Sequence, residues 1–372
     1  MICMAAVGVA TGMTWPLLSL RLDQMGCDSG SIGLSACVQS AAALAVSPIV
    51  PELLTRCGTL RVVGACLVVI ITCLLSFPAL PGFDHWLGIR AVFGAAVSMV
   101  SIATPIWITA VARRDNTGAT IGFFGLLWSA GFAMGPCIIW MMGSDGWRPF
   151  AAAAGIVTIA ALPSWTLRCD VPVVIPATAT HWNSVLRGLT TPALTAALML
   201  GILDAANDCF LPLYGLRNGL DESSAVSMLV TLQIGVTAAQ LPIGWLADRL
   251  SCERLMSVLA GGGMLALCFL PSTAQYSRWR VADIGLLGFS IGGIWTTSVV
   301  LLAEQFNGCE RAIGNMARAF LYGLGGILFL PLVGFGFDQL GADVLPASGA
   351  AAFLLLGLSC SRTRISRRKA RI

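Results

Sequence analysis

The chain has 372 residues, of which 57% are hydrophobic and only 11% are charged, with a mean hydropathy of +0.84. A soluble globular domain carries about 25% charged residues, so this composition excludes an ordinary water-soluble protein. The apolar residues form stretches of roughly 20, the length that a helix needs to cross a bilayer core about 30 Å thick. Because a helix satisfies its own backbone hydrogen bonds in lipid and an open sheet does not, the sequence predicts an all-α membrane protein.

Apolar runs bounded by charged residues, glycine and proline predict twelve transmembrane helices. In chain order they cover residues 2–20, 31–51, 61–82, 87–111, 118–142, 149–167, 192–214, 225–246, 255–271, 284–303, 313–336 and 345–360. The first run lacks a preceding charged segment and a cleavage site, so it is interpreted as a membrane helix rather than a removable signal. Residues 168–191, which contain two prolines and a polar run, predict a cytoplasmic linker.

The basic residues are unequally divided between the two sides of these spans. Of the 22 Lys and Arg residues, 15 fall in the loops and C-terminal segment of one side and five in the loops of the other. The positive-inside rule then predicts that both termini are cytoplasmic. We expect a multi-pass protein of the cell membrane, here a bacterial inner membrane. The basic segment 361–372 directly follows the last apolar run, which predicts contact with anionic lipid rather than nucleic acid.

Cysteine and histidine usage indicates no metal or cofactor. The thirteen Cys are scattered singly, and the only His residues are His85 and His181. Without paired Cys spacings or a His cluster, neither a disulfide framework nor a zinc site is expected. The glycine-rich runs also lack the strand–turn–helix context of a nucleotide-binding loop.

The two halves of the chain repeat one another. The matched pairs are residues 15–21 and 211–217 (WPLLSLR and LPLYGLR), Gly26 and Gly219, Asp28 and Asp221, and residues 106–111 and 294–299 (IWITAV and IWTTSV). Their separation stays between 188 and 196 residues, which chance similarity among apolar helices does not easily produce. We therefore predict two pseudo-symmetric six-helix bundles, residues 1–167 and 192–360, an arrangement suited to alternating access.

A turn between two spans of the second half carries a family resemblance. Residues 244–254 (GWLADRLSCER) resemble the loop signature of the major facilitator superfamily of transporters, which joins the second and third helices and, in its copy, the eighth and ninth. The matching residues are Gly244, Asp248, Arg249 and Arg254 in the second copy and Arg56, Gly58 and Arg61 in the first. The resemblance implies that this loop holds the cytoplasmic helix ends in one of two conformations. Thr55 replaces the acid in the first copy, which predicts a weaker latch there.

Two further segments resemble the same superfamily. Residues 90–94 (RAVFG) are similar to its fourth-helix signature, which implies a role for Arg90 in proton coupling. Arg90 also lies near the start of its span, so a side chain that reaches the outer surface remains an alternative. Gly125, Gly131, Gly135 and Pro136 partly resemble the fifth-helix pattern of drug/proton antiporters, although the glycine pair expected after the proline is missing.

Two acids and an amide side chain lie within the seventh span. Asp204, Asn207 and Asp208 have the i, i+3, i+4 spacing that places side chains on one helical face. Two carboxylates this close in a low dielectric are not expected both to ionise, so one can exchange a proton. Acids inside a membrane usually serve function, which favours coupling or substrate binding. A structural pair satisfied by hydroxyls and water is the alternative, and Arg90 is the expected positive partner.

Spans four and ten line the central cavity in the superfamily, and their aromatic and hydroxyl side chains are candidates for binding an amphipathic or sugar-like solute. These candidates are Trp107, Thr109, Trp295, Thr296 and Thr297, with Gln39, Gln233, Trp128 and Tyr322 as weaker ones. A Trp near a span end can instead anchor the membrane interface. Glu304 and Arg318 lie near span ends and are expected to reach the surface or to form a gate. The glycine-rich runs in spans five, nine and eleven predict close helix packing.

These features predict a secondary transporter that moves a small organic solute by alternating access, coupled to protons by efflux antiport or uptake symport. We expect a monomer without a cofactor. A membrane-embedded lipid-modifying enzyme is a second possibility, but His85 has only Asp84 and Trp86 beside it and His181 has no adjacent acid, which is not a convincing acid–base constellation. A receptor or scaffold that has the transporter fold without transport is a third.

Overall fold

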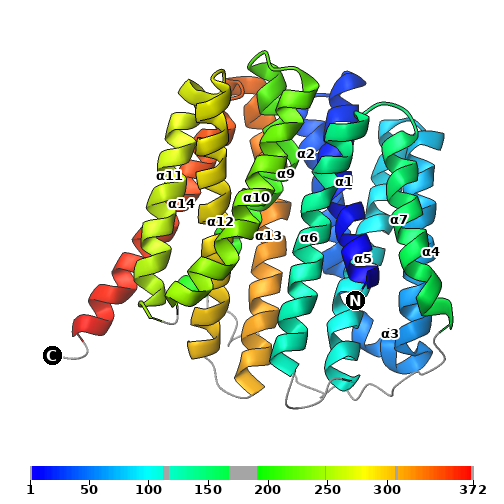
Figure 1. The fold of residues 1–372 in the computed structure, drawn as a ribbon, viewed down its shortest axis with the longest axis horizontal. Helices are drawn as coiled ribbons and strands as arrows, with labels where there is room; N and C mark the ends of the chain where they lie inside the picture. The colour runs from blue at the N-terminus through cyan, green and yellow to red at the C-terminus, as the bar shows by residue number, and fades with distance from the viewer. Residues whose placement is uncertain (1, 112–116, 167–190, 248, 306–308, 370–372) are drawn as a thin grey trace. The chain divides into compact units, whose positions relative to one another are not determined.

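The computed structural model describes residues 2–111, 117–166, 191–247, 249–305 and 309–369, whose regular structure is helical (Figure 1). The long helices of the first half are α1 (Ile2–Gln24), α2 (Ser29–Val46), α4 (Thr59–Ala79), α5 (Phe83–Val111), α6 (Thr117–Met142) and α7 (Arg148–Thr166). Those of the second half are α9 (Pro192–Arg217), α10 (Glu222–Ala247), α11 (Cys252–Thr273), α12 (Ser277–Gln305), α13 (Cys309–Leu340) and α14 (Val344–Lys369). Each corresponds to one predicted span.

The surfaces of these helices suit a lipid environment. Among the described segments, eleven helices are long and apolar enough to cross a membrane, and α7 adds a shorter apolar stretch over residues 148–162. Large apolar side chains such as Met141, Ile159, Leu241 and Val258 are exposed. Soluble monomers rarely expose extended apolar surface, whereas a bilayer core is an apolar solvent for it. The all-α membrane architecture predicted from composition is confirmed.

One short helix departs from the predicted spans. The sequence predicts a second span through residue 51, but α2 ends at Val46 and α3 (Val50–Cys57) follows as a separate helix. Pro48 has no N–H to continue the hydrogen-bond ladder of α2, and the second proline, Pro51, lies in the first turn of α3, where a missing N–H costs nothing. The apolar run therefore crosses a turn.

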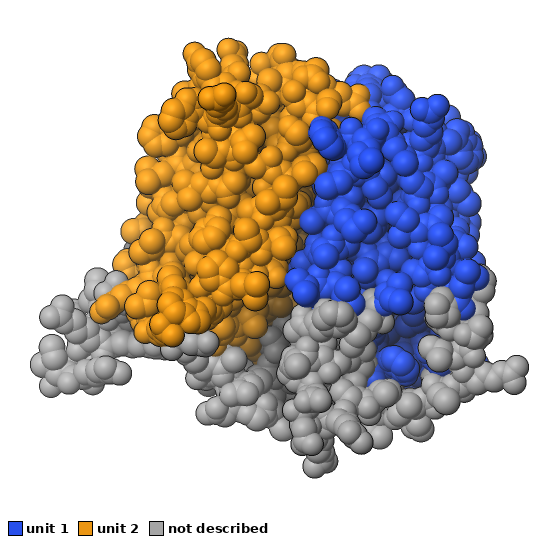
Figure 2. All heavy atoms as spheres, viewed as in Figure 1, with its two compact units in different colours: residues 1–27, 34–177 blue, residues 28–33, 178–372 orange. Residues whose placement is uncertain are grey.

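The helices form two units, shown in different colours in Figure 2: residues 1–27 and 34–177 form unit 1, and residues 28–33 and 178–372 form unit 2. In unit 1, α1 packs against α5, α6 and α7, and α4 packs against α5 and α7. In unit 2, α9 packs against α12, α13 and α14, and α11 packs against α12 and α14. These are the same pairs in repeat order. Helices α1 and α9 are also equally enclosed, with 78% of the most apolar window buried in each.

The repeat extends to the turn that follows the first helix of each half. Gly26 and Gly219 have φ values of +80° and +82°, and the next N–H groups donate back into the last turns of α1 and α9. This is the glycine-terminated helix end that only a residue without a β-carbon adopts readily. Two residues later, Asp28 and Asp221 each accept a hydrogen bond from a backbone N–H three residues ahead, capping α2 and α10.

Glycines bring the central helix of each unit close to a neighbour. A β-carbon at Gly12 or Gly135 in unit 1 would overlap the facing backbone of α6 or α1. In unit 2, one at Gly201 or Gly325 would overlap the facing backbone of α13 or α9. The packing role predicted for the glycines is therefore confirmed in spans five and eleven, and in the ninth span Gly263 lies against an aromatic ring of α14.

Candidate functional site

The first half of the candidate site joins α9 to α13. The hydroxyl of Tyr322 on α13 donates a hydrogen bond to the Asp204 carboxylate on α9, with 3.0 Å between the oxygens. Gly201 lies one turn before Asp204, directly against the Tyr322 backbone. Because no side chain separates the two helices there, the tyrosine ring can extend alongside α9 and its hydroxyl can reach the acid. Local backbone packing thus positions this polar pair.

The second acid of α9 is bound by a different helix. Asp208 is 7% exposed, and its carboxylate accepts a hydrogen bond of 3.2 Å from the side-chain amide of Gln233 on α10. A buried carboxylate without donors is costly, and each of these two acids has one donor from a neighbouring helix of unit 2. Gln233, a weaker candidate from the sequence, is therefore part of the site.

Asn207 departs from the face expected for it. Its side-chain amide donates to the Leu203 carbonyl of its own helix at 2.7 Å. It lines a small cavity of about 10 Å³ with Leu267 of α11 and Ser348 of α14. With 3.6 residues per turn, a residue at i+3 lies roughly 100° around the helix from one at i+4. That rotation turns Asn207 away from Gln233 and into the interior of unit 2.

An arginine and a tryptophan extend the site. The Tyr322 ring packs edge-on against Trp295 of α12, with centroids 5.6 Å apart and an interplanar angle of 79°. The Arg318 guanidinium lies over the Trp295 ring, 4.4 Å from its centroid, in cation–π contact. Arg318 and Tyr322 share one face of α13 because they are four residues apart. We call the set Asp204, Asp208, Gln233, Trp295, Arg318 and Tyr322 the acid–aromatic cluster.

The threonines beside Trp295 bond within their own helix. The Thr296 hydroxyl donates to the Gly292 carbonyl at 3.0 Å, and the Thr297 hydroxyl, which is fully buried, bonds carbonyls of the preceding turn. Back-bonding of this kind uses the hydroxyl proton locally. In this structure these side chains therefore donate no hydrogen bond to the acid–aromatic cluster.

In unit 1, Arg90 is wholly buried and donates from Nη1 to the Ser35 hydroxyl of α2 at 2.8 Å. One turn further along α5, a β-carbon at Gly94 would overlap the backbone carbonyl of Gln39, which is itself buried. The segment that resembles a family signature thus packs α5 closely on α2. The alternative that the Arg90 side chain reaches the outer surface is therefore wrong, because this side chain is wholly buried. Pairing of Arg90 with the acids of α9 would involve both units and stays a prediction.

The remaining cavity candidates are less informative. Trp107 and Trp128 are half-buried, and no hydrogen-bond acceptor within the described part of the chain meets the Trp107 indole N–H. The side chain of Thr109 lies outside the described residues. So do residues 168–190 of the predicted linker and the basic side chains that follow residue 361.

The two loop copies that resemble the family signature differ in their contacts. In the first, Arg56 pairs with Glu52 one turn earlier in α3, an acid that the sequence comparison with the second copy does not indicate. In the second, the Arg249 guanidinium lies 3.7 Å from the Trp245 ring centroid. Arg61, Gly58, Gly244 and Arg254 lie at exposed or half-buried positions of these turns. Asp248 lies outside the described residues.

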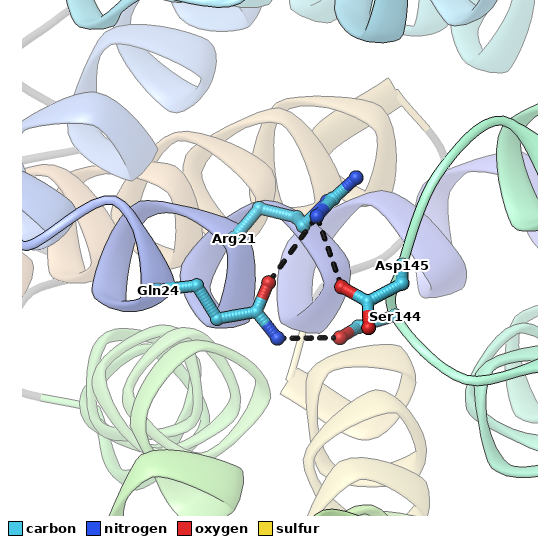
Figure 3. A network of polar contacts seen from close by, with 4 residues as sticks. All are labelled: Arg21, Gln24, Ser144 and Asp145. Carbon is cyan, nitrogen blue, oxygen red and sulfur yellow. Dashed lines mark hydrogen bonds and ion pairs between the residues drawn. The ribbon is translucent and has the colours of Figure 1, made fainter.

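A polar network at the end of α1 was not predicted (Figure 3). Arg21 donates to Gln24 at 3.3 Å and to Asp145 at 3.1 Å, and Gln24 donates to Ser144 at 3.0 Å. The network borders a cavity of about 240 Å³ that is also lined by Phe77, Trp86 and Phe150. Because Asp145 is 81% exposed, its ion pair with Arg21 contributes little stability. The network ties the end of α1 to the turn before α7.

Comparisons with known proteins agree with this architecture. The sequence model of the Major Facilitator Superfamily matches residues 1–330 and 194–369. A Bacillus subtilis (strain 168) protein, the uncharacterized MFS-type transporter YfkF, is 25% identical over 329 residues, which cover 86% of this chain and 83% of that protein.

Solved structures share the fold at low identity. A point mutant of the nucleoside transporter NupG superimposes with a TM-score of 0.80 at 13% identity, over 97% of this chain and 98% of that one. A bacterial homologue of the human lysosomal transporter Spinster, in an inward-facing and unoccupied conformation, gives 0.79 at 12% identity, over 96% and 93%. A D-xylose–proton symporter gives 0.73 at 13% identity, over 95% of both chains. With the family match along its length, this chain belongs to the major facilitator superfamily of membrane transporters.

Proposed function

We propose that this protein is a proton-coupled secondary transporter of a small organic solute, and that Asp204 and Asp208 exchange the coupling proton. The observation that carries this proposal is the pair of acids within α9, each of which accepts a hydrogen bond from a neutral side chain of another helix. An ionised carboxylate in such a place is costly. Protonation removes that cost, so the charge of the pair can change during a transport cycle.

Protonation also changes what the neighbouring helices share with α9. An ionised Asp204 can only accept the hydrogen bond from Tyr322, whereas a protonated one can donate to the tyrosine oxygen. Because Tyr322 packs on Trp295, a change at the acid alters a contact shared by α9, α12 and α13. Aromatic rings beside polar groups also suit a small organic ligand. The relative that is a D-xylose–proton symporter supports proton coupling within this fold.

The membrane orientation belongs to the same proposal. We place the protein in a bacterial inner membrane as a monomer with both termini in the cytoplasm. The support is the excess of basic residues in the loops on that side of the predicted spans. Accessibility of single cysteines introduced into these loops, measured from each side of sealed vesicles, tests the orientation.

The coupling proposal is tested in vesicles that contain the purified protein and an internal pH-sensitive dye. A panel of nucleosides, pentoses and small organic acids is added under an imposed pH gradient. We expect at least one solute to cause proton movement into or out of vesicles that contain the wild type. The same solute should cause no proton movement in vesicles that contain Asp204→Asn or Asp208→Asn. Tyr322→Phe keeps both acids and should slow the movement without abolishing it.

Asp283→Asn is the matched control, since this α12 acid lies outside the acid–aromatic cluster and accepts a hydrogen bond of 2.8 Å from Thr273. It should retain solute-dependent proton movement. Gradient-driven accumulation that survives both Asp204→Asn and Asp208→Asn contradicts the carboxylate mechanism. Solute movement without any proton movement in the wild type would instead indicate a uniporter.

A further inference from the structure

The positive charge of the acid–aromatic cluster, on Arg318, has no anionic partner among the described side chains. Arg318 Nε and Nη1 are both buried, and neither has a hydrogen-bond acceptor within the described ranges. The guanidinium lies over the face of Trp295 in cation–π contact. Such a contact is weaker than an ion pair and gives the Arg318 N–H groups no hydrogen-bond acceptor. A buried charged group normally has an opposite charge or hydrogen bonds to compensate its lost hydration.

The nearby acids do not supply that partner. Asp204 accepts its hydrogen bond from Tyr322 and Asp208 accepts its own from Gln233. The ion pairs found among the described side chains are Arg21 with Asp145 and Arg56 with Glu52, both in unit 1. Arg318 therefore shares the acid–aromatic cluster with two acids but forms an ion pair with neither of them.

We propose that Arg318 binds the anionic group of the transported solute, and that this solute is a small organic acid. A guanidinium presents N–H donors in a rigid plane that matches the two oxygens of a carboxylate. The same contact supplies both the missing acceptors and the missing negative charge. Trp295 and Tyr322 provide an apolar surface for the rest of the molecule. This inference rests on the proposed function and names the class of solute.

The charges of the cluster explain how such a solute would be linked to a proton. Binding an organic anion at Arg318 adds one negative charge, and protonating Asp204 or Asp208 removes one. Binding the anion and the proton together leaves the net charge of the cluster unchanged. Binding either one alone changes the net charge, which is costly in a low dielectric. Each should therefore strengthen the binding of the other, which is the reciprocal coupling that thermodynamics requires of linked sites.

The test measures equilibrium binding to the purified protein in detergent, without a gradient. Benzoate and lactate are compared with the neutral amides benzamide and lactamide by their effect on the thermal unfolding midpoint. We expect at least one acid to raise the midpoint of the wild type and its amide to bind at least tenfold more weakly. Arg318→Gln should abolish this preference for the acid. Arg278→Gln, which removes an exposed arginine of α12, should keep it.

Arg318→Lys keeps the charge and guards against a glutamine variant that does not fold. It should retain the preference for the acid with a lower ratio of acid affinity to amide affinity than the wild type, since an ammonium lacks the planar fork. An arginine that only supports the fold would leave this ratio unchanged. The inference is overturned if the ratio is the same in Arg318→Lys as in the wild type, or if acid and amide stabilise the wild type equally. It is also overturned if no acid stabilises it, or if phosphate or chloride alone does so through Arg318.

Failure of this inference can be separated from failure of proton coupling. Asp204→Asn and Asp208→Asn should still bind the acid in detergent, since Arg318 is intact, but should lose gradient-driven movement. Acid binding without any effect of a pH gradient would contradict the coupling proposal and leave the anion site standing. If a pH gradient drives the movement of neutral solutes only, the coupling proposal stands and the anion site at Arg318 is contradicted.

Discussion

Units 1 and 2 use the same helix pairs but place different chemistry on the central helix. With Pro16 aligned to Pro212, Asp204 and Asp208 of α9 correspond to Gly8 and Gly12 of α1. In unit 1 these glycines lie against the backbone of α6, so the positions serve packing. In unit 2 the corresponding positions carry acids that accept hydrogen bonds from α13 and α10.

The two units therefore share a helix arrangement but differ in the side chains of α1 and α9. The close approach that α9 loses at its acids is provided one turn earlier by Gly201, against Tyr322. In unit 1 the buried charge lies elsewhere, on Arg90 of α5, and is bound by a serine of α2. The helix packing is therefore shared, while the acid pair Asp204 and Asp208 belongs to unit 2.

The largest effect on stability is expected where packing and site meet. Gly201→Ala places a β-carbon into the Tyr322 carbonyl oxygen and must push α13 away from α9. Overpacking of this kind costs about 1–3 kcal/mol or more, and it should also lengthen the contact between Tyr322 and Asp204. Thermal unfolding of the purified protein in detergent, with size-exclusion chromatography, measures the loss.

Gly261→Ala is the control for this substitution, since nothing lies within 4 Å of a β-carbon added there. Alanine is a better helix former than glycine by roughly 1 kcal/mol, so this variant should be slightly more stable than the wild type. Equal shifts of the same sign at Gly201 and Gly261 would mean that the close crossing of α9 and α13 does not hold.

An intermediate effect is expected at the buried charge of unit 1. Ser35→Ala removes the hydroxyl that accepts the hydrogen bond from Arg90, and losing a hydrogen bond to a charged group costs about 1.5–3 kcal/mol. Ser76→Ala, at a half-buried serine whose hydroxyl bonds within α4, should stay within about 0.5 kcal/mol of the wild type. The measurement is the free energy of unfolding in denaturant. If Ser35→Ala instead abolishes solute-dependent proton movement as fully as Asp204→Asn, the chemistry is not confined to unit 2.

The sequence predicts the fold well because its signals are local. Span length and hydropathy depend on about 20 consecutive residues, and the repeat is visible in short motifs that fold alike, such as those at Gly26 and Gly219. The prediction fails at α3, where an apolar run continues through Pro48 although the helix does not. Apolar composition does not reveal a turn that a missing N–H imposes.

The site is predicted only in part because its contacts join distant residues. Asp204 and Asp208 stand out as acids in an apolar span, but their donors Tyr322 and Gln233 are identified only by the packing of α13 and α10 on α9. From its position near a span end, the sequence predicts that Arg318 reaches the surface or forms a gate. Its stacking on Trp295 depends on how α12 and α13 cross, which the sequence does not show. The sequence shows only that Arg318 and Tyr322 are four residues apart on one helix.

The smallest effect is expected where the two halves are most alike, at the caps of α2 and α10. Hydrogen bonds from the side chain and the N–H of Ser31 hold the pKa of Asp28 below its ordinary value, and those from Ser224 do the same for the pKa of Asp221. A carboxyl whose pKa is lowered by folding stabilises the folded state above its unfolded pKa, and this contribution is lost as the pH falls through the folded value. Asp28→Ala should therefore cost about 1 kcal/mol at neutral pH, a typical loss for a cap.

The difference between Asp28→Ala and the wild type should shrink as the pH falls below about 4, the ordinary range of an aspartic acid, in unfolding midpoints measured from pH 7 to pH 3. Asp28→Asn keeps a capping side chain without the titrating group, so it should lose the pH dependence while retaining most of the stability. Asp221→Ala should change the midpoint in the same direction and over the same pH range, since its cap has the same geometry. If Asp28→Ala and Asp221→Ala shift the unfolding midpoint in opposite directions, the two matched turns are alike only in their backbone. The asymmetry of the two halves then begins at the turn that directly follows α1 and α9.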